Sequence, residues 1–159
     1  SVNSLVREWE IPLIVNDDLE LAASLPCLGL HVGQDDVSPA EARQVLGPDR
    51  IIGLSTHSSV QVREAIALGK TLSYFAVGPV FATPTKPESS PVGLELVSEV
   101  AKWNPTTPFF CIGGIKRNNV ARVAAAGANR VAVVSDFLCS PNVAEAVREM
   151  AVSLAGTLA

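Results

Sequence analysis

The sequence predicts an α/β fold in which strands and helices alternate along the chain, and three observations support this. Short apolar runs recur at intervals, and each is continuously apolar, which is typical of parallel strands covered on both faces. Amphipathic segments with the helical period separate these runs. The connections between them are short, as in repeated βα units. Because 48% of the 159 residues are hydrophobic and 18% are charged, we expect one core and a single domain over residues 1–159.

Six apolar runs are expected to form strands. In chain order they are IPLIV (11–15), CLGLHV (27–32), IIGLS (51–55), YFAVGPV (74–80), PFFCIGG (108–114) and RVAVVS (130–135). One helix is expected after each run, so the chain contains six βα units.

The helices are expected from their apolar period and from their end signals. Ser38 and Pro39 are a typical N-cap and first helical residue, and Ser58 begins another helix that ends near Gly69. The expected helical segments are 17–25, 38–47, 58–70, 93–103, 116–128 and 140–156.

Two architectures accept this alternation, an open doubly wound sheet and a closed (β/α)8 TIM barrel. An open sheet that binds a nucleotide usually has a glycine-rich turn after its first strand, and IVNDD is not such a turn. Polar residues follow nearly every run, and a barrel brings all such strand ends to one mouth. This favours the barrel, although six units are too few to close a ring of eight strands.

Composition and charge exclude several classes of function. The net charge of −4 and the pI near 5.1 argue against a nucleic-acid surface, and no apolar run approaches the roughly 20 residues of a membrane span. The first ten residues do not have the basic-then-apolar order of a signal peptide. Cys27, Cys111 and Cys139 have no metal-ligand spacing and no accompanying His and acid pattern. We therefore expect small buried thiols in a cytoplasmic protein.

Carboxylates at two neighbouring strand ends indicate a metal site. Asp17 follows the first run and Asp36 follows the second. Two adjacent carboxylates repel each other unless a cation lies between them, and oxygen ligands without His or Cys suit Mg²⁺, which commonly also binds substrate phosphates. The alternative is that Asp18 and Asp36 only cap the helices that follow them.

A second group of residues suits an anion. Gly113 and Gly114 close the fifth run, and a phosphate can approach their backbone N–H groups because they have no side chains; the alternative is a tight turn. The stretch GPVFATPTKP (78–87) offers threonine hydroxyls and the charge of Lys86, although an ordinary strand-to-helix connection has a similar composition.

The two histidines and the hydroxyl groups give no sign of covalent catalysis. His31 lies inside an apolar run and is interpreted as a hydrogen-bonded core residue, whereas His57 lies at a strand end, where core and site roles are both open. No nucleophile has a partnered base in the pattern.

Seven segments, in this order and spacing, resemble the thiamine phosphate synthase (thiamine-phosphate pyrophosphorylase) family. They are IVNDD, HVGQDD, STHS, GPVFATPTK, PVGLE, IGGI and VAVVS. The resemblance covers nearly the whole chain from about residue 10 onward. It implies a TIM barrel that joins hydroxymethylpyrimidine pyrophosphate to a thiazole phosphate and releases pyrophosphate. The partners are then small molecules, and a homo-oligomer is left open.

The resemblance also implies site residues. Asn16 would contact the pyrimidine, Asp17 and Asp36 would hold Mg²⁺, and Ser55 and Lys86 would contact the pyrimidine pyrophosphate and serve catalysis. The thiazole phosphate would be bound by residues of three loops: Thr83, Pro84, Thr85, Gly113, Gly114, Val134 and Ser135. The implied mechanism needs no nucleophile, because the bond to pyrophosphate breaks first and the thiazole nitrogen captures the pyrimidine carbocation.

The resemblance further implies two βα units before IPLIV, so the present units correspond to strands 3 to 8 of the family barrel. SVNSLVREWE is then expected to be the end of the preceding helix. We expect the chain by itself to be inactive and to associate through its unpaired sheet edges. Two alternatives stay open: a relative resembling thiazole tautomerase, and a non-catalytic piece that binds thiazole phosphate.

Overall fold

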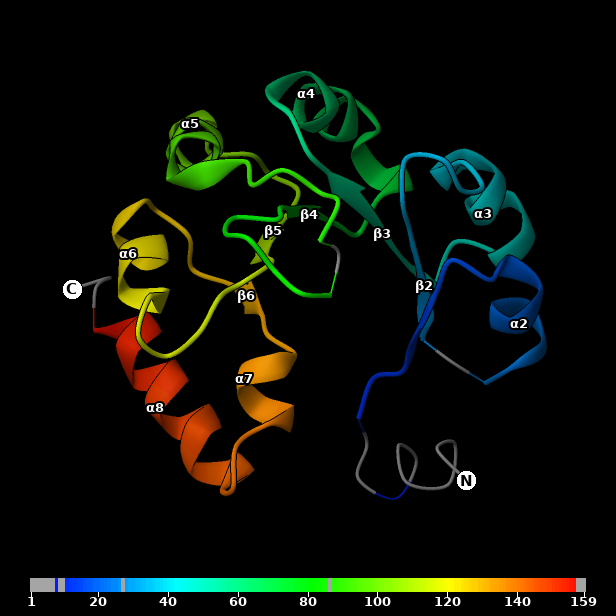
Figure 1. The fold of residues 1–159 in the computed structure, drawn as a ribbon. Coiled ribbons are helices and arrows are strands. Elements are labelled where there is room, and N and C mark those ends of the chain that lie inside the picture. Colours follow the sequence, from blue (N-terminus) through cyan, green and yellow to red (C-terminus); the bar gives the residue numbers. More distant parts are fainter. Residues whose placement is uncertain (1–7, 9–10, 27, 86, 157–159) are drawn as a thin grey trace.

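A single parallel sheet organises the computed structural model, which describes residues 8, 11–26, 28–85 and 87–156 (Figure 1). The strands are β1 (Ile14–Asn16), β2 (Gly29–Val32), β3 (Ile51–Thr56), β4 (Tyr74–Val77), β5 (Phe109–Ile112) and β6 (Val131–Ala132). They lie side by side in chain order, and every neighbouring pair is parallel. The prediction of six parallel strands in one α/β sheet is confirmed.

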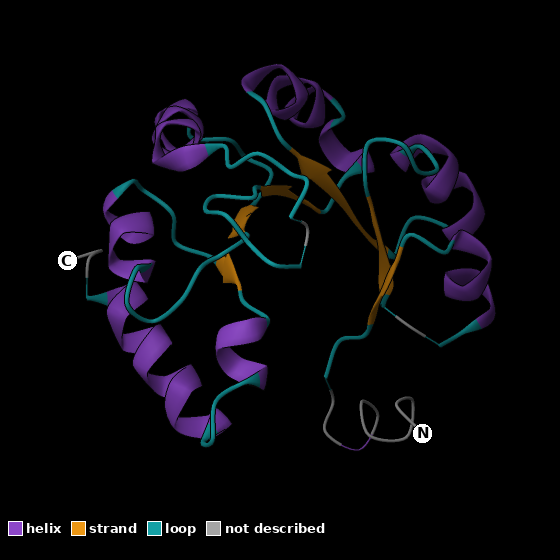
Figure 2. Cartoon of the chain, in the orientation of Figure 1, coloured by secondary structure: helices purple, strands orange, loops and turns teal. Residues whose placement is uncertain are grey.

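Helices follow every strand and lie along the outer side of the curved sheet (Figure 2). They are α2 (Leu19–Ser24), α3 (Pro39–Leu46), α4 (Ser59–Ala67), α5 (Gly93–Trp103), α6 (Val120–Ala125), α7 (Ser135–Leu138) and α8 (Val143–Ala155), with a 3₁₀ turn η1 at Gly69–Thr71. The expected alternation is confirmed, and α7 is a short helix that the sequence pattern did not predict.

The sheet curves as a half-barrel. β1 and β6 are its two edge strands among the described residues, so a closed eight-stranded barrel is not confirmed. The predicted helix tail over residues 1–10 lies outside the described residues, except for Glu8.

Three strands end earlier than their apolar runs. After β4 the chain leaves the regular ladder, but the N–H groups of Val80 and Phe81 still donate to the carbonyls of Ile112 and Gly113, at 2.8 and 3.0 Å. Gly113 and Gly114 have φ values of 96° and 64°, which cannot continue a strand. The run at 130–135 forms only two strand residues, because Ser135 already begins α7.

Side-chain caps explain where the helices begin. Ser38 and Ser58 cap α3 and α4 as predicted, with their hydroxyl oxygens accepting from the N–H groups of Glu41 and Gln61. Asp18 caps α2 by accepting from Leu21 N–H at 2.8 Å. The alternative that Asp36 caps a helix is wrong, because its Oδ2 accepts from Gly33 N–H in the preceding turn.

α6 is shorter than the segment 116–128 predicted for it. The Asn119 carboxamide closes a turn ahead of the helix: it accepts from Lys116 N–H at 2.8 Å and donates to the Gly114 carbonyl at 2.9 Å. The helix therefore begins only at Val120. This turn fixes the chain that follows the two glycines.

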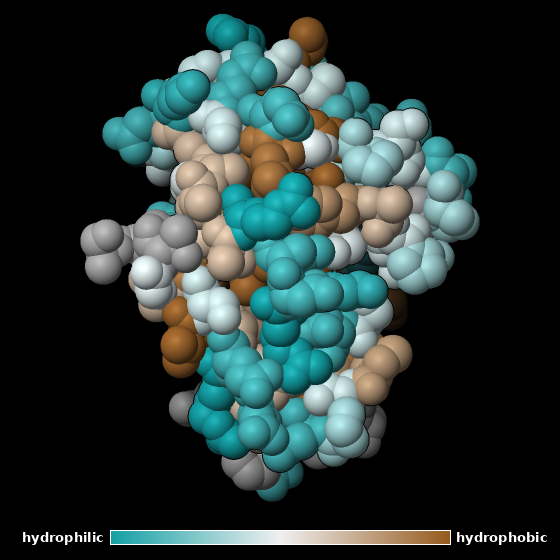
Figure 3. Space-filling view, turned by 60° about the vertical axis from the view of Figure 1, so that its left-hand side comes forward, coloured by the Kyte–Doolittle hydropathy of each residue, from teal (hydrophilic) through white to brown (hydrophobic). Residues whose placement is uncertain are grey.

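The core lies between the sheet and the helices. Its largest fully buried side chains include Phe75, Leu30 and Ile52 from three central strands. The side of the molecule turned to the viewer in Figure 3 combines hydrophilic surface with separate hydrophobic patches. Among the described residues, none of the helices has the length and the apolar character that crossing a membrane requires.

Candidate functional site

A cavity of about 140 Å³ lies at the carboxyl ends of β3 to β6. Residues from four strand ends contribute to its wall: Ser55, His57, Gly78, Pro79, Thr83, Thr85, Ser89, Ile112, Gly113, Gly114, Ile115, Ala132, Val133, Val134 and Ser135. The predicted convergence of strand ends on one site therefore holds for these four strands. The wall combines hydroxyl groups with apolar surface, which suits a ligand that has both an oxyanion and an apolar ring.

The double glycine brings two loops of this wall together. A Cβ at Gly113 would lie 2.5 Å from Pro79 Cα, and one at Gly114 would lie 2.6 Å from the Ala82 carbonyl oxygen, so no side chain fits at either position. Both glycines also have positive φ. The tight-turn interpretation therefore accounts for their geometry, and the same turn places them against the cavity.

Ser55 lies at the end of a polar chain that begins on β4. Tyr74 Oη is 2.9 Å from His31 Nδ1, and His31 Nε2 is 2.9 Å from Ser55 Oγ. The prediction that His31 is a hydrogen-bonded residue is confirmed. Burial raises the pKa of the Tyr74 phenol, so the phenol stays protonated at neutral pH. The Ser55 side chain is oriented by its hydrogen bond with His31, and its backbone is held by Gln34 Nε2, which donates to the Ser55 carbonyl at 2.6 Å.

His57 is fixed at the rim of the same cavity. Its Nδ1 is 2.5 Å from the Gly78 carbonyl oxygen, and its backbone N–H donates to Gln61 Oε1 at 2.7 Å. A carbonyl oxygen only accepts hydrogen bonds, so Nδ1 carries the proton. In neutral His57, Nε2 is then an acceptor, and in the imidazolium it is a donor.

The residues predicted to bind metal and pyrimidine lie at the neighbouring strand ends, not in this cavity. Asn16 ends β1 and pairs in register with His31 on β2, and exposed Asp17 follows it. Exposed Asp36 lies in the turn after β2. Among the described residues, no cluster of three or more His, Cys, Asp or Glu side chains has a metal-binding arrangement. The predicted pair supplies two carboxylates from adjacent strand ends, a donor set that fits Mg²⁺ with substrate and water completing its coordination.

Pro84, in the loop after β4, was predicted to bind the thiazole phosphate but does not line the cavity. Pro84 lines a separate shallow pocket with Pro87 and Ser90, and the predicted Lys86 lies outside the described residues. Sequence reasoning missed Ser89 and Ile112 as cavity residues. Ile112 belongs to an apolar run that predicted a strand, and the pattern did not indicate that its side chain is 37% exposed. Ser89 gave no signal beyond its place in a polar loop.

Comparison with known proteins adds independent evidence. A sequence model of the family described as "Thiamine monophosphate synthase" matches residues 1–137. The chain belongs to the thiamine monophosphate synthase family. The family resemblance inferred from the seven segments is thereby confirmed.

Relatives of this family are similar along nearly the whole chain. A thiamine-phosphate synthase of Synechococcus sp. (strain CC9311) is 44% identical over 155 residues, which are 98% of this chain and 43% of that protein. One of Pelotomaculum thermopropionicum is 41% identical over 150 residues, or 94% of this chain and 67% of that protein. The chain spans less than half the length of the Synechococcus relative.

Solved structures of the family have the same fold. The thiamine phosphate pyrophosphorylase from Pyrococcus furiosus superposes with a TM-score of 0.81 at 26% identity, over 99% of this chain and 74% of that one. The 3-hexulose-6-phosphate synthase from Salmonella typhimurium gives 0.70 at 12% identity, over 98% and 79% of the two chains, which is a likeness of fold alone.

Proposed function

We propose that this chain belongs to a transferase that joins hydroxymethylpyrimidine pyrophosphate to thiazole phosphate, giving thiamine phosphate and pyrophosphate. The observation that carries the proposal is the cavity at the ends of β3 to β6. Of the predicted thiazole phosphate residues, it contains Thr83, Thr85, Gly113, Gly114, Val134 and Ser135. Family membership supports the same reaction.

The thiazole phosphate is proposed to bind in this cavity. Hydroxyl groups of Thr83, Thr85 and Ser135 surround it and can donate to a phosphate. Ile112 and half-exposed Val134 supply apolar surface for a thiazole ring. Gly113 and Gly114 line the same cavity, and their backbone N–H groups are proposed to contribute to phosphate binding.

The pyrimidine pyrophosphate is proposed to bind toward β1 and β2. Asn16 would contact the pyrimidine, and Asp17 and Asp36 would hold Mg²⁺, which would neutralise charge on the pyrophosphate. Ser55 lies between the two regions, since it lines the cavity and is hydrogen-bonded to His31 of β2. Lys86 is proposed to contact the same pyrophosphate.

In the proposed reaction, Ser55 and Lys86 would act electrostatically. The bond between pyrimidine and pyrophosphate would break first, and the thiazole nitrogen would capture the resulting carbocation. Ser55 and Lys86 would stabilise the negative charge that develops on the leaving group, and such stabilisation is commonly worth about 3 kcal/mol per well-placed group. No protein nucleophile is required, in agreement with the absence of a nucleophile–base pattern in the sequence.

A second candidate function is binding of thiazole phosphate without catalysis. It is favoured by one observation: the cavity contains the predicted thiazole phosphate residues, whereas Asn16, Asp17 and Asp36 do not line it. Calorimetric titration distinguishes the two. Heat with thiazole phosphate but none with pyrophosphate and Mg²⁺ would favour binding alone, and heat with both ligands would favour the transferase.

The metal proposal is tested with Asp17→Asn and Asp36→Asn. Each change removes one of two charges on which Mg²⁺ depends, so Mg²⁺-dependent pyrophosphate affinity should fall about tenfold or more, exceeding the effect of losing a surface ion pair. Asp49→Asn, at an exposed carboxylate in the turn after α3, is the matched control. Wild-type Mg²⁺ dependence in both site variants would refute the assignment.

A further inference from the structure

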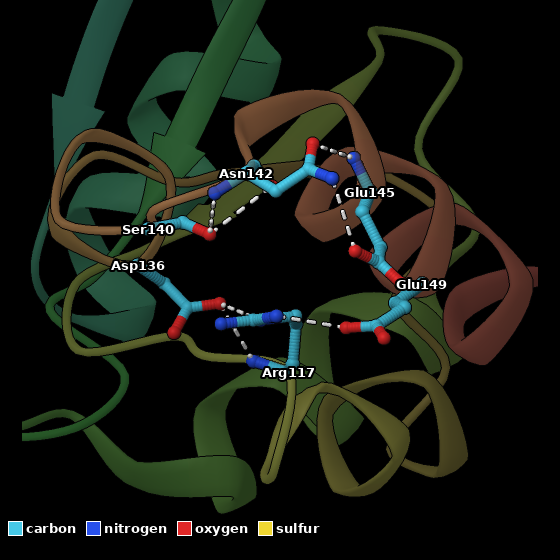
Figure 4. Close-up of polar contacts among 6 residues, drawn as sticks. All are labelled: Arg117, Asp136, Ser140, Asn142, Glu145 and Glu149. Atoms are coloured by element: carbon cyan, nitrogen blue, oxygen red, sulfur yellow. Dashed lines mark hydrogen bonds and ion pairs between the residues drawn. The ribbon is translucent and has the colours of Figure 1, made fainter.

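Arg117 ties three parts of the chain together through polar contacts (Figure 4). Its backbone N–H and its Nε donate to Asp136 Oδ2 at 3.1 and 3.0 Å, and its Nη1 donates to Glu149 Oε2 at 2.8 Å. Hydrogen bonds that the guanidinium donates to Glu149 and Asp136 raise its pKa, although it is charged at any physiological pH in any case. The residue therefore joins the β5–α6 loop to α7 and α8.

The two ion pairs differ in their surroundings. The side chain of Asp136 is 15% exposed, and that of Glu149 is 53% exposed. A contact between exposed charges is screened by solvent and contributes little, whereas the Asp136 contact is sheltered and involves two donors on one oxygen. Asp136 is therefore the more important partner.

The position of the short helix α7 depends on contacts with other segments, such as that between Arg117 and Asp136. It has only four residues, none of the described side chains caps its N-terminus, and so short a helix is not stable on its own. Ser135, its first residue, and Val134 line the cavity, and Asp136 follows directly. A link that holds Asp136 therefore also holds this wall of the cavity.

The other end of the link also lies in sequence near the cavity. Gly114, which lines the cavity, lies three residues before Arg117. The carboxamide of Asn119 holds this loop by bonding the Gly114 carbonyl and Lys116 N–H, so the loop moves as one piece. Arg117 thus connects two walls of the cavity, one at Gly113–Gly114 and the other at Val134–Ser135.

We propose that Arg117 is a positioning residue for ligand binding: its contact with Asp136 sets the spacing between Gly113–Gly114 and Val134–Ser135, and thereby the affinity for a phosphate monoester bound between them. The ligand class rests on the proposed function. Arg117 itself does not line the cavity, so its proposed role is to position residues that do.

The test compares Arg117→Met, Arg117→Lys and Glu149→Gln. Arg117→Met keeps the backbone bond to Asp136 but loses the side-chain bonds, so affinity for thiazole phosphate should fall about fivefold to tenfold. Lysine keeps the charge and should restore most of the affinity, and Glu149→Gln should change it less than about twofold. Affinity for Mg²⁺ pyrophosphate should stay at the wild-type value in all three, which a general loss of structure would not allow.

The matched control is Arg63→Met. Arg63 is also paired, with Glu99 at 3.9 Å, but it lies on α4, outside the cavity wall. It should bind thiazole phosphate as the wild type does. Hydrogen exchange supplies a readout that needs no ligand: amides at 113–115 and 134–137 should exchange faster in Arg117→Met than in Arg63→Met.

Two results separate failure of this inference from failure of the proposed function. Unchanged thiazole phosphate affinity and unchanged exchange in Arg117→Met would overturn the positioning role. If the wild type binds no thiazole phosphate, the proposed function fails, and faster exchange at both walls in Arg117→Met would still support the link. If Arg117→Met does not fold, Arg117→Gln, which also lacks the charged guanidinium, decides: weakened thiazole phosphate affinity supports the proposal, and wild-type affinity combined with wild-type exchange refutes it.

Discussion

Replacement of Gly53 by alanine should disrupt the polar chain that ends at Ser55. Gly53 lies on β3 between His31 of β2 and Tyr74 of β4, and it pairs in register with both. Because Gly53 has no side chain, the two rings meet across it, with Nδ1 and Oη 2.9 Å apart and their centroids separated by 5.5 Å. Strands two places apart are otherwise about 10 Å from each other.

The free-energy cost of Gly53→Ala follows from the distances between an added Cβ and the neighbouring side chains. A Cβ on Gly53 would lie 2.5 Å from His31 Nδ1 and 2.5 Å from Tyr74 Oη, closer than the 3.0 Å that real Cβ atoms respect. At least one ring must move, which combines overpacking with a lost hydrogen bond, together about 2 kcal/mol. For a chain of this length the melting temperature should fall by about 4–8 °C.

Tyr74 also provides a specific assay, because it is the single tyrosine of the sequence. Burial raises the pKa of its phenol, and a ring displaced toward solvent should ionise closer to the ordinary value. Tyrosinate absorbance in an alkaline titration reports this change, and urea denaturation reports the stability. The proposed binding of pyrophosphate with Mg²⁺ should weaken as well, since Ser55 loses its orientation through His31.

Gly47→Ala is the matched control for this experiment. Gly47 has φ of 81° with no atom within 4 Å of an added Cβ, so alanine there introduces backbone strain of about 1 kcal/mol without touching Tyr74. The titration of Tyr74 should be unchanged. Wild-type stability and wild-type tyrosine titration in Gly53→Ala would refute the reasoning.

Three further predictions concern stability. Burial raises the pKa of the Cys111 thiol from 9.0 to about 12, so the folded chain keeps a proton that the unfolded chain loses. The free energy of unfolding should therefore fall as pH rises above about 9, by up to about 1.4 kcal/mol per pH unit, and urea denaturation at several pH values should show a smaller slope for Cys111→Val. Arg43 donates to four backbone carbonyls, including those of Arg50 and Thr71, and Arg43→Met should lower the free energy of unfolding by about 2 kcal/mol in the same assay. Ser38→Ala should cost about 1 kcal/mol through the loss of the α3 cap, measured by thermal denaturation.

The strand and helix order could be predicted because local patterns determine it. Continuous apolar runs marked the parallel strands, and Ser38 and Ser58 marked helix starts through hydrogen bonds that span only three residues. The short helix α7 could not be predicted in this way. It is one turn long, and its contact with Arg117 joins residues 19 apart.

The sequence could predict those site residues that lie at strand ends. It could not predict contacts between side chains of neighbouring strands. Thr83, Gly113 and Ser135 lie at or just beyond the carboxyl ends of apolar runs, so the parallel arrangement alone brings them together. The contact of Ser55 with His31 depends on the register between strands and on a missing side chain at Gly53, neither of which is visible in a local pattern.

The strand order of the sheet has a consequence for how the chain folds. Each strand pairs only with the strands next to it in the sequence, so the molecule resembles a short stack of repeats. Units of this kind assemble through contacts between consecutive segments, and loop closure over long distances is not needed. Among the described residues, β2 to β5 have partners on both sides and β1 and β6 have one each, so opening should begin at the ends of this stack and reach the middle last. The cavity spans β3 to β6. Its wall at the end of β6 should therefore open early, and its wall at the end of β3 should open late.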